Sequence, residues 1–171
     1  MEILKIVPFL FIFLSSSSLL SQSVDWETLE NAELKETEDF VKIDSLILKL
    51  INWLGNHHLD HKDRIKANSI FMKWMTGSPS VTVNLDNYLM SYTKKNGDFL
   101  LLYMAGWSKY VLENPDKKED TFGGRMAGVN YFLDYYEKGK DSGVKKDRKV
   151  VKLLKKRKAG KLEKFIAQKI E

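Results

Sequence analysis

The chain has 171 residues, 43% of them hydrophobic and 30% charged, a composition typical of one globular domain with a hydrophobic core. It contains no cysteine, which excludes disulfides, thiol nucleophiles, iron–sulfur clusters and cysteine-type zinc sites. We do not expect a bacterial lipoprotein either, because its anchor needs a lipid-bearing cysteine. The formal net charge of +5 is modest, so the total charge alone indicates no class of partner.

The first 23 residues, MEILKIVPFLFIFLSSSSLLSQS, predict a secretory signal peptide. A lysine precedes an apolar run from Ile6 to Leu14, and the stretch closes on the small residues Ser21 and Ser23. The apolar run is shorter than the roughly 20 residues that span a bilayer, which argues against a membrane-spanning helix. The alternative to a cleaved signal peptide is an uncleaved N-terminal anchor. We expect an exported protein, periplasmic or secreted, whose residues 24–171 form a single helical domain.

The first strong helix signal lies in residues 43–54, where apolar side chains recur at helical spacing: Ile43, Leu46, Ile47, Leu50, Ile51 and Leu54. The Gly-Asn pair that follows suits a helix end. The same spacing returns in residues 67–74, and TGSPSVTVN then breaks it, with its two valines expected as a short extended piece. A further helix is expected through residues 85–92.

The second half of the chain continues the helical pattern. Residues 99–107 are apolar nearly all round, which predicts a helix buried on most sides at the centre of a bundle, and Pro115 ends it. Residues 126–136 have apolar side chains at roughly helical spacing. Two short helices, about 146–158 and 161–170, finish the chain with a glycine as their joint. The sequence therefore predicts an all-α fold, an irregular bundle or array of six to eight helices.

Charge divides the predicted domain into two unlike segments. Residues 25–44 hold eight acidic side chains against two lysines, a net charge of −6. Residues 138–171 hold fourteen lysines and arginines against four acidic side chains, a net charge of +10. Within the basic part, residues 145–171 also place apolar stripes among the lysines, which predicts basic amphipathic helices.

All three histidines lie in NHHLDHKDR and raise the question of a metal site. His57 and His61 stand at i and i+4, the spacing at which two side chains of one helix bind the same zinc ion, and Asp60 is a third candidate ligand. That geometry needs a continuous helix, whereas the preceding Gly-Asn indicates a helix end and Asp60 with Asp63 indicates the start of the next helix. We therefore favour solvated histidines, two in a linker and His61 in a first turn, and expect no cofactor.

The glycines of FGGRMAG do not match a phosphate-binding loop, because no strand precedes them and neither nucleotide-binding spacing is present. Gly124 and Gly128 are four residues apart and therefore share one helix face. Ala105 and Gly106 on the predicted central helix offer a matching smooth patch. We interpret these four positions as sites of close helix packing. No residue pattern in the chain indicates a catalytic site.

The basic end is the strongest functional candidate. Its stretch VKKDRKVVKLLKKRKAGKLEKFIAQKI can bind an acidic partner or make a weak contact with an anionic membrane, while export argues against a nucleic acid. The alternative is intramolecular: the apolar stripes dock on the bundle, and the lysines face water or the acidic N-terminal segment. The candidate contact residues are Lys152, Lys155, Lys156, Arg157, Lys158 and Lys161.

Several stretches, INWLGNHHLD, FMKWMTGSPSVTV, LLYMAGWSKYVLEN, MAGVNYFLDYY and GKLEKFI, together resemble small exported helical proteins of Bacteroidota bacteria, a group with no known activity. The resemblance implies export and an α-helical fold, and it implies no active residues. Our hypothesis is an exported, non-enzymatic helical protein that acts through protein–protein contacts with an envelope or periplasmic protein. The alternative is a small-molecule or metal-binding protein, or an enzyme, that uses the His57/His61 loop or an aromatic groove.

Overall fold

The computed structural model describes residues 23–169, so the predicted signal peptide, apart from Ser23, lies outside the described residues. The all-α prediction is confirmed, because this part of the chain forms helices and no strand. The nine α-helices are α1 (Trp26–Asn31), α2 (Thr37–Lys42), α3 (Asp44–Asn56), α4 (Arg64–Gly77), α5 (Asn87–Thr93), α6 (Asp98–Glu113), α7 (Thr121–Glu137), α8 (Arg148–Lys158) and α9 (Leu162–Ala167). Two short 3-10 helices, η1 (Pro115–Lys117) and η2 (Gly139–Ser142), follow α6 and α7.

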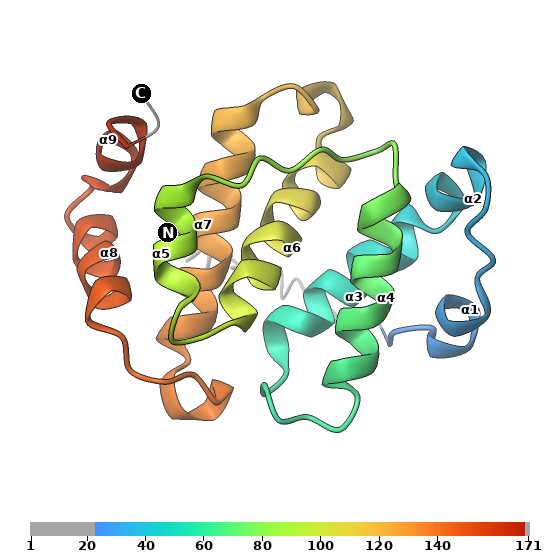
Figure 1. The fold of residues 1–171 in the computed structure, drawn as a ribbon, viewed down its shortest axis with the longest axis horizontal. Coiled ribbons are helices and arrows are strands. Elements are labelled where there is room, and N and C mark those ends of the chain that lie inside the picture. The colour runs from blue at the N-terminus through green and yellow to red at the C-terminus, as the bar shows by residue number, and fades with distance from the viewer. Residues whose placement is uncertain (1–22, 170–171) are drawn as a thin grey trace, which may run out of the picture.

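The antiparallel helices α6 and α7 lie side by side at the centre of the fold (Figure 1). The apolar sequence of α6 leaves almost no polar face, and Phe99, Leu102 and Trp107 are at most 1% exposed. Phe99 stacks on Phe132 of α7, with the ring centroids 5.4 Å apart. Burial of these large side chains is the main source of stability for the pair, because it removes apolar surface from water.

The remaining helices cover the two flanks of this central pair. The helices α3 and α4 lie on one flank with α1 and α2 beyond them, whereas α5, α8 and α9 lie on the other (Figure 1). Each flank turns an apolar stripe inward. In α3 the predicted stripe is buried at Ile47, Leu50, Ile51 and Leu54, whereas Leu46 is only partly buried. In α8 and α9 the inward residues are Val150, Leu153, Leu162 and Ile166.

The acidic segment folds into two helices that the apolar spacing did not predict. Each has only six residues, and carboxylates fix where it begins. Asp25 accepts a hydrogen bond from the backbone N–H of Thr28 at 3.0 Å, and Asp39 accepts one from the N–H of Glu36 at 3.0 Å. Such caps satisfy the free donors of a helix start without a long apolar stripe. They raise the helix count within residues 23–169 to nine, above the predicted six to eight.

The link between α4 and α5 contains Val81 and Val83, where the sequence predicted a short extended piece. Val81 is 5% exposed and Val83 packs against the core, yet neither belongs to a strand. A single extended segment needs a neighbouring strand to bond its backbone, and the described part of the fold offers none. The valines therefore act as core residues on an irregular link.

Candidate functional site

The histidines lie in the linker between α3 and α4, residues 57–63. His57 follows α3 directly and stacks on Trp53, with the ring centroids 4.1 Å apart. His61 lies edge-on to both rings, 5.1 Å from Trp53 and 5.2 Å from His57. The expectation that His61 belongs to a first helical turn is wrong, because α4 begins only after Asp63, its N-cap residue. The histidine loop is thus an aromatic cluster on a linker.

Hydrogen bonds at the ring nitrogens argue against a metal site in this loop. His58 Nδ1 accepts from the backbone N–H of Asp60 at 3.0 Å, and His61 Nδ1 accepts from that of Asp63 at 3.2 Å. In these two rings the Nδ1 lone pair is therefore engaged by the backbone, whereas His57 contacts the Trp53 carbonyl oxygen through Nδ1 at 2.9 Å. The Asp60 side chain is 90% exposed. No group of three or more metal-binding side chains is present among residues 23–169, and His57, His61 and Asp60 are not brought together as a ligand set.

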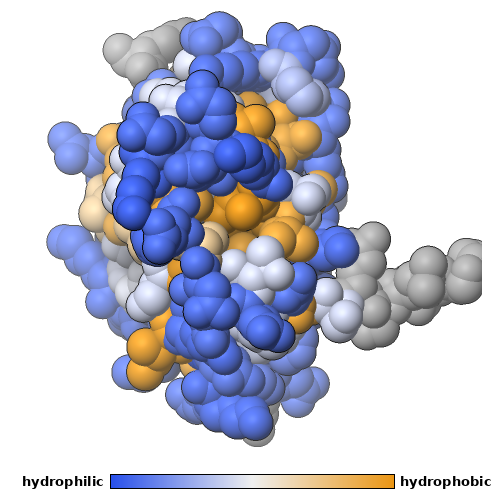
Figure 2. Space-filling model, turned by 90° about the vertical axis from the view of Figure 1, so that its right-hand side faces the viewer, coloured by the Kyte–Doolittle hydropathy of each residue, from blue (hydrophilic) through white to orange (hydrophobic). Residues whose placement is uncertain are grey.

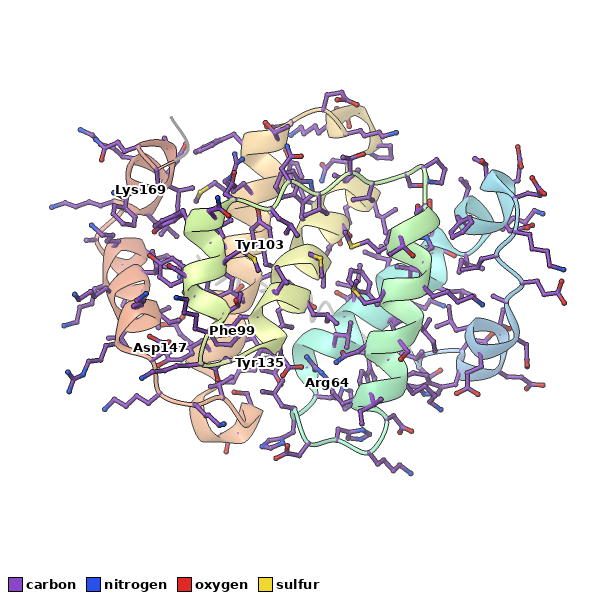
Figure 3. The ribbon with its side chains drawn as sticks, viewed as in Figure 1. Arg64, Phe99, Tyr103, Tyr135, Asp147 and Lys169 are labelled. Atoms are coloured by element: carbon purple, nitrogen blue, oxygen red, sulfur yellow. The ribbon has the colours of Figure 1, made fainter. Side chains whose placement is uncertain are left out.

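Beneath this linker, side chains from α4 and α7 hold the C-terminus of α3 (Figure 3). Arg64, only 2% exposed, donates from Nη1 to the carbonyl oxygens of Leu54 at 2.6 Å and His57 at 3.3 Å. Tyr135 donates to the same His57 carbonyl at 2.7 Å. The last carbonyls of a helix lack intrahelical donors, and positive charge is favourable there. We therefore assign the buried arginine and the tyrosine to helix capping.

The four small residues predicted to allow close packing all lie on α6 and α7: Ala105, Gly106, Gly124 and Gly128. A Cβ atom at Gly128 would come within 2.6 Å of the Tyr103 carbonyl oxygen, and one at Gly124 would overlap Trp107. Gly106 faces Tyr131 instead. The glycines of α7 therefore lie against aromatic residues of α6, and not against the patch of Ala105 and Gly106.

At the basic end, two of the predicted contact residues hold α8 against α7. Arg157 Nη1 lies 2.6 Å from Asp134, and Arg157 also pairs with Glu137. Lys158 Nζ lies 3.1 Å from the same Glu137. The hydrogen bond from Lys158 and the charge of Arg157 lower the pKa of Glu137 below its usual value. The charges of Arg157 and Lys158 are therefore paired with carboxylates of the same molecule.

The other predicted contact residues remain at the surface. Lys152, Lys155 and Lys161 are exposed and Lys156 is half-buried, and none of them forms an ion pair with a carboxylate of residues 23–169. Lys149 joins them, because positions 149, 152 and 156 stand at i, i+3 and i+7 and share one face of α8. The prediction missed Lys149, although its spacing is readable in the sequence. We call these five lysines, 149, 152, 155, 156 and 161, the basic face.

A groove of about 380 Å³ lies beside the basic face, between α5 and the pair α8–α9. Three lysines of the basic face line it on the α8 side. The other lining residues are Ser91, Tyr92, Leu153 and Phe165, and none is acidic. Lys156 Nζ lies 3.9 Å from the centroid of the Phe165 ring, a cation–π contact that places the ammonium group over the apolar floor.

The acidic helices α1 and α2 lie at the opposite end of the molecule from α8 and α9 (Figure 1). Figure 2 faces this end and shows hydrophobic side chains in a hollow framed by hydrophilic ones. Several of its carboxylates pair with nearby lysines: Glu30 with Lys66 (2.6 Å), Glu33 with Lys35 (2.7 Å) and Asp39 with Lys42 (3.2 Å). The lysines of the basic face therefore face water and not the acidic segment.

No protein family, curated protein or solved structure matches this chain. None of the helices within residues 23–169 combines the length and hydrophobicity that crossing a bilayer requires. The functional assignment therefore depends on the geometry of the basic face and its groove.

Proposed function

We propose that the chain is an exported, non-enzymatic helical protein that acts through protein–protein contacts at the cell envelope, with the basic face binding an acidic partner. The main supporting observation is the pattern of ion pairs on α8. Arg157 and Lys158 pair with carboxylates of α7, whereas the lysines of the basic face pair with no carboxylate in the described part of the chain. Since α8 is docked on the core, these lysines present a fixed array of positive charge.

Burial of the apolar stripe favours a protein partner over a lipid surface. A basic amphipathic helix binds a membrane by inserting its apolar face between the lipids. Here Val150 and Leu153 are at most 1% exposed, and Leu162 and Ile166 are at most 4% exposed. Contact with a membrane would then depend mainly on the attraction of the lysines to anionic headgroups, which is weak.

Electrostatic contact also predicts how the association responds to salt. Opposite charges on two surfaces raise the association rate and exclude wrong partners. Exposed charges are screened beyond about 8 Å at physiological ionic strength, so added salt weakens such a contact. Binding through the basic face is therefore expected to fall steeply as salt is raised.

Export to the envelope is supported by the composition of residues 1–23, with a short apolar run followed by small residues. The resemblance to exported helical proteins of Bacteroidota bacteria points the same way. In an extracytoplasmic compartment the basic face meets envelope proteins and lipids, and no nucleic acid.

Cell fractionation tests the proposal in the organism that makes the protein. The envelope pellet is washed at low and then at high salt, and the intact mass of the released protein is measured. We expect release only at high salt, with a mass that lacks the residues up to Gln22 or Ser23. A cleaved protein found wholly in the soluble fraction would contradict the envelope contact. An uncleaved mass in salt-resistant membranes would contradict the signal peptide.

A matched pair of charge reversals assigns the contact to the basic face. Lys149→Glu/Lys152→Glu alters two exposed lysines of the basic face, and Lys62→Glu/Lys117→Glu alters two exposed lysines elsewhere, with the same change in net charge. We expect the first variant to bind the envelope pellet roughly tenfold more weakly, since 1.4 kcal/mol of lost attraction suffices for that. Equal retention of both variants would refute the proposed surface.

A further inference from the structure

The groove has features that a purely electrostatic contact does not need. Its rim is formed by three lysines of α8, but its floor is apolar: Leu153 is 1% exposed, Tyr92 is 7% exposed and Phe165 is half-buried. The ring of Tyr88 packs on both Tyr92 and Phe165, at centroid distances of 5.3 Å and 6.0 Å. Aromatic packing thus holds the floor in place, and the groove is a preformed hollow with one sign of charge along its rim.

We propose that this groove receives a large apolar side chain from an acidic segment of the partner protein, while the rim lysines bind carboxylates on either side of that side chain. The inference rests on the proposed function and specifies the chemistry of the partner. Insertion of an apolar side chain adds burial of apolar surface to the electrostatic attraction, and it gives specificity that charge alone does not supply.

The spacing of the rim lysines sets the spacing of the carboxylates. Lys149 and Lys156 are seven residues apart, which is about 10 Å along a helix at 1.5 Å per residue. An extended chain covers about 10 Å in three residues. Two carboxylates about 10 Å apart, with a large apolar side chain between them, therefore match the rim and the floor together.

The size of the groove favours a side chain over a lipid. Its volume of about 380 Å³ lies near the lower end of the range of about 300–1,000 Å³ for ligand pockets. This space suits one inserted side chain better than the several acyl chains of a membrane lipid. Four of the apolar residues of α8 and α9, Val150, Leu153, Leu162 and Ile166, are already buried in the core and cannot insert into a bilayer.

Labelled peptides test the groove with the purified protein. The first peptide is extended and acidic, with a central phenylalanine between glutamates. The second has alanine in place of the phenylalanine, and the third has lysines in place of the glutamates. By fluorescence anisotropy at near-physiological salt, we expect the first peptide to bind roughly tenfold more tightly than the second, because burial of a phenylalanine side chain supplies at least that factor. The third peptide should not bind.

Two variants separate the groove from the charge. Ser91→Trp fills the groove and leaves every lysine in place, and Thr82→Trp adds the same side chain on an exposed link as a control. We expect Ser91→Trp to make the phenylalanine and alanine peptides bind equally, and Thr82→Trp to preserve their difference. Lys149→Glu/Lys152→Glu should weaken both peptides.

The outcomes distinguish the groove from the proposed function. If the phenylalanine and alanine peptides bind equally and with strong salt dependence, the groove proposal is wrong and the proposed function stands. If neither acidic peptide binds, both are wrong. Anionic phosphatidylglycerol vesicles and dodecyl phosphate are measured beside the peptides. Tighter binding of either one than of the phenylalanine peptide would identify an amphiphile site and overturn the peptide proposal.

Discussion

The two charged ends of the molecule use their charges in different ways. At the acidic end, carboxylates begin helices and pair with nearby lysines: Asp25 caps α1, Asp39 bonds at the start of α2, and Glu30 pairs with Lys66. At the basic end, only Arg157 and Lys158 pair with carboxylates, and the basic face pairs with none among residues 23–169. A cluster of charge in a sequence is therefore not by itself a binding surface. How much charge is available to a partner protein depends on how many of the charged side chains form ion pairs within the molecule.

The basic end packs directly on α7, and the acidic end packs on α3 and α4, of which α3 packs on α6 and α7. A defect in the central pair should therefore loosen both ends. Gly106→Val places a side chain into Tyr131 and within 2.9 Å of the Ala127 carbonyl oxygen at its Cβ atom. Overpacking of this kind is expected to lower the free energy of unfolding by about 1–3 kcal/mol. Urea unfolding measures the loss, and hydrogen exchange should show faster exchange in α1 and in α8 alike.

Gly97→Ala is the matched control for that prediction. Nothing lies within 4 Å of a Cβ atom there, and Gly97 has a φ of −56°, which alanine adopts readily. We expect unchanged stability or a gain of about 0.4–1 kcal/mol, because alanine reduces the entropy of the unfolded chain. An unfolding midpoint shared by Gly106→Val and Gly97→Ala would show that the central pair is not closely packed.

Caps at the two ends should differ in how much stability they supply. Asp147 is 4% exposed and accepts from the backbone N–H of Lys149 at 2.7 Å, at the start of α8 (Figure 3). Asp147→Ala is expected to cost about 1 kcal/mol within the usual range of about 0.5–2 kcal/mol, and Asp147→Asn should restore most of it. Asp25→Ala at the exposed start of α1 should cost less. Thermal unfolding compares the three variants, and equal losses for both alanine variants would contradict the difference between the ends.

Glu137 makes the docking of α8 dependent on pH. Its pKa is lowered from the usual 4.5 in the folded protein, first by the hydrogen bond from Lys158 and then by the charge of Arg157. A lowered pKa stabilises the fold above pH 4.5, and that contribution is lost as the pH falls through the folded value. Since Glu137 is partly exposed, the effect is expected to be about 0.2–1 kcal/mol.

Comparison with Glu137→Gln isolates that contribution. The wild type should be more stable than the variant at about pH 7, and the difference should shrink as the pH falls through the lowered pKa of Glu137. Glu163→Gln, on an exposed position of α9, is the control and should not change the profile. A Glu137→Gln difference that persists unchanged at low pH would show that the ion pairs do not hold α8.

The smallest effect is expected at the acidic end. The hydrogen bond from Lys66 to Glu30 raises the pKa of Lys66, whose ammonium group also lies 4.6 Å from the centroid of the Trp26 ring. Glu30→Gln removes one exposed ion pair and should change urea unfolding least among these variants. It should leave binding to the envelope pellet unchanged. Weaker envelope binding by this variant would mean that the acidic end is also a contact surface.

The sequence predicted the fold best where burial is periodic. The stripe of α3 and the apolar run of α6 specify long buried helices, because repeated burial at helical spacing is a strong local signal. The helices α1 and α2 were missed, since their caps depend on single carboxylates such as Asp25 and Asp39. The stop of α3 was predictable from its Gly-Asn end, whereas the late start of α4 after Asp63 was not.

The candidate site was predictable only in part. The lysines of α8 were identified from composition, and the face shared by Lys149, Lys152 and Lys156 follows from helical spacing. The sequence did not predict that Arg157 and Lys158 form ion pairs with α7 and so leave the set of contact residues. These pairs depend on which carboxylates of α7 point toward α8. The groove was equally hidden, since its lining from α5 and its lining from α8 and α9 are distant in sequence and meet only in the folded protein.

Lysine footprinting with an amine-reactive reagent tests most directly the claim that the basic face presents its charge to a partner. In the purified protein, Lys149, Lys152, Lys155 and Lys161 should react faster than Lys66 and Lys158, which are held in ion pairs. On envelope membranes, the same four lysines should become protected and should recover in high salt. Protection confined to lysines beside α1 and α2, with the basic face as reactive as in solution, would contradict the account.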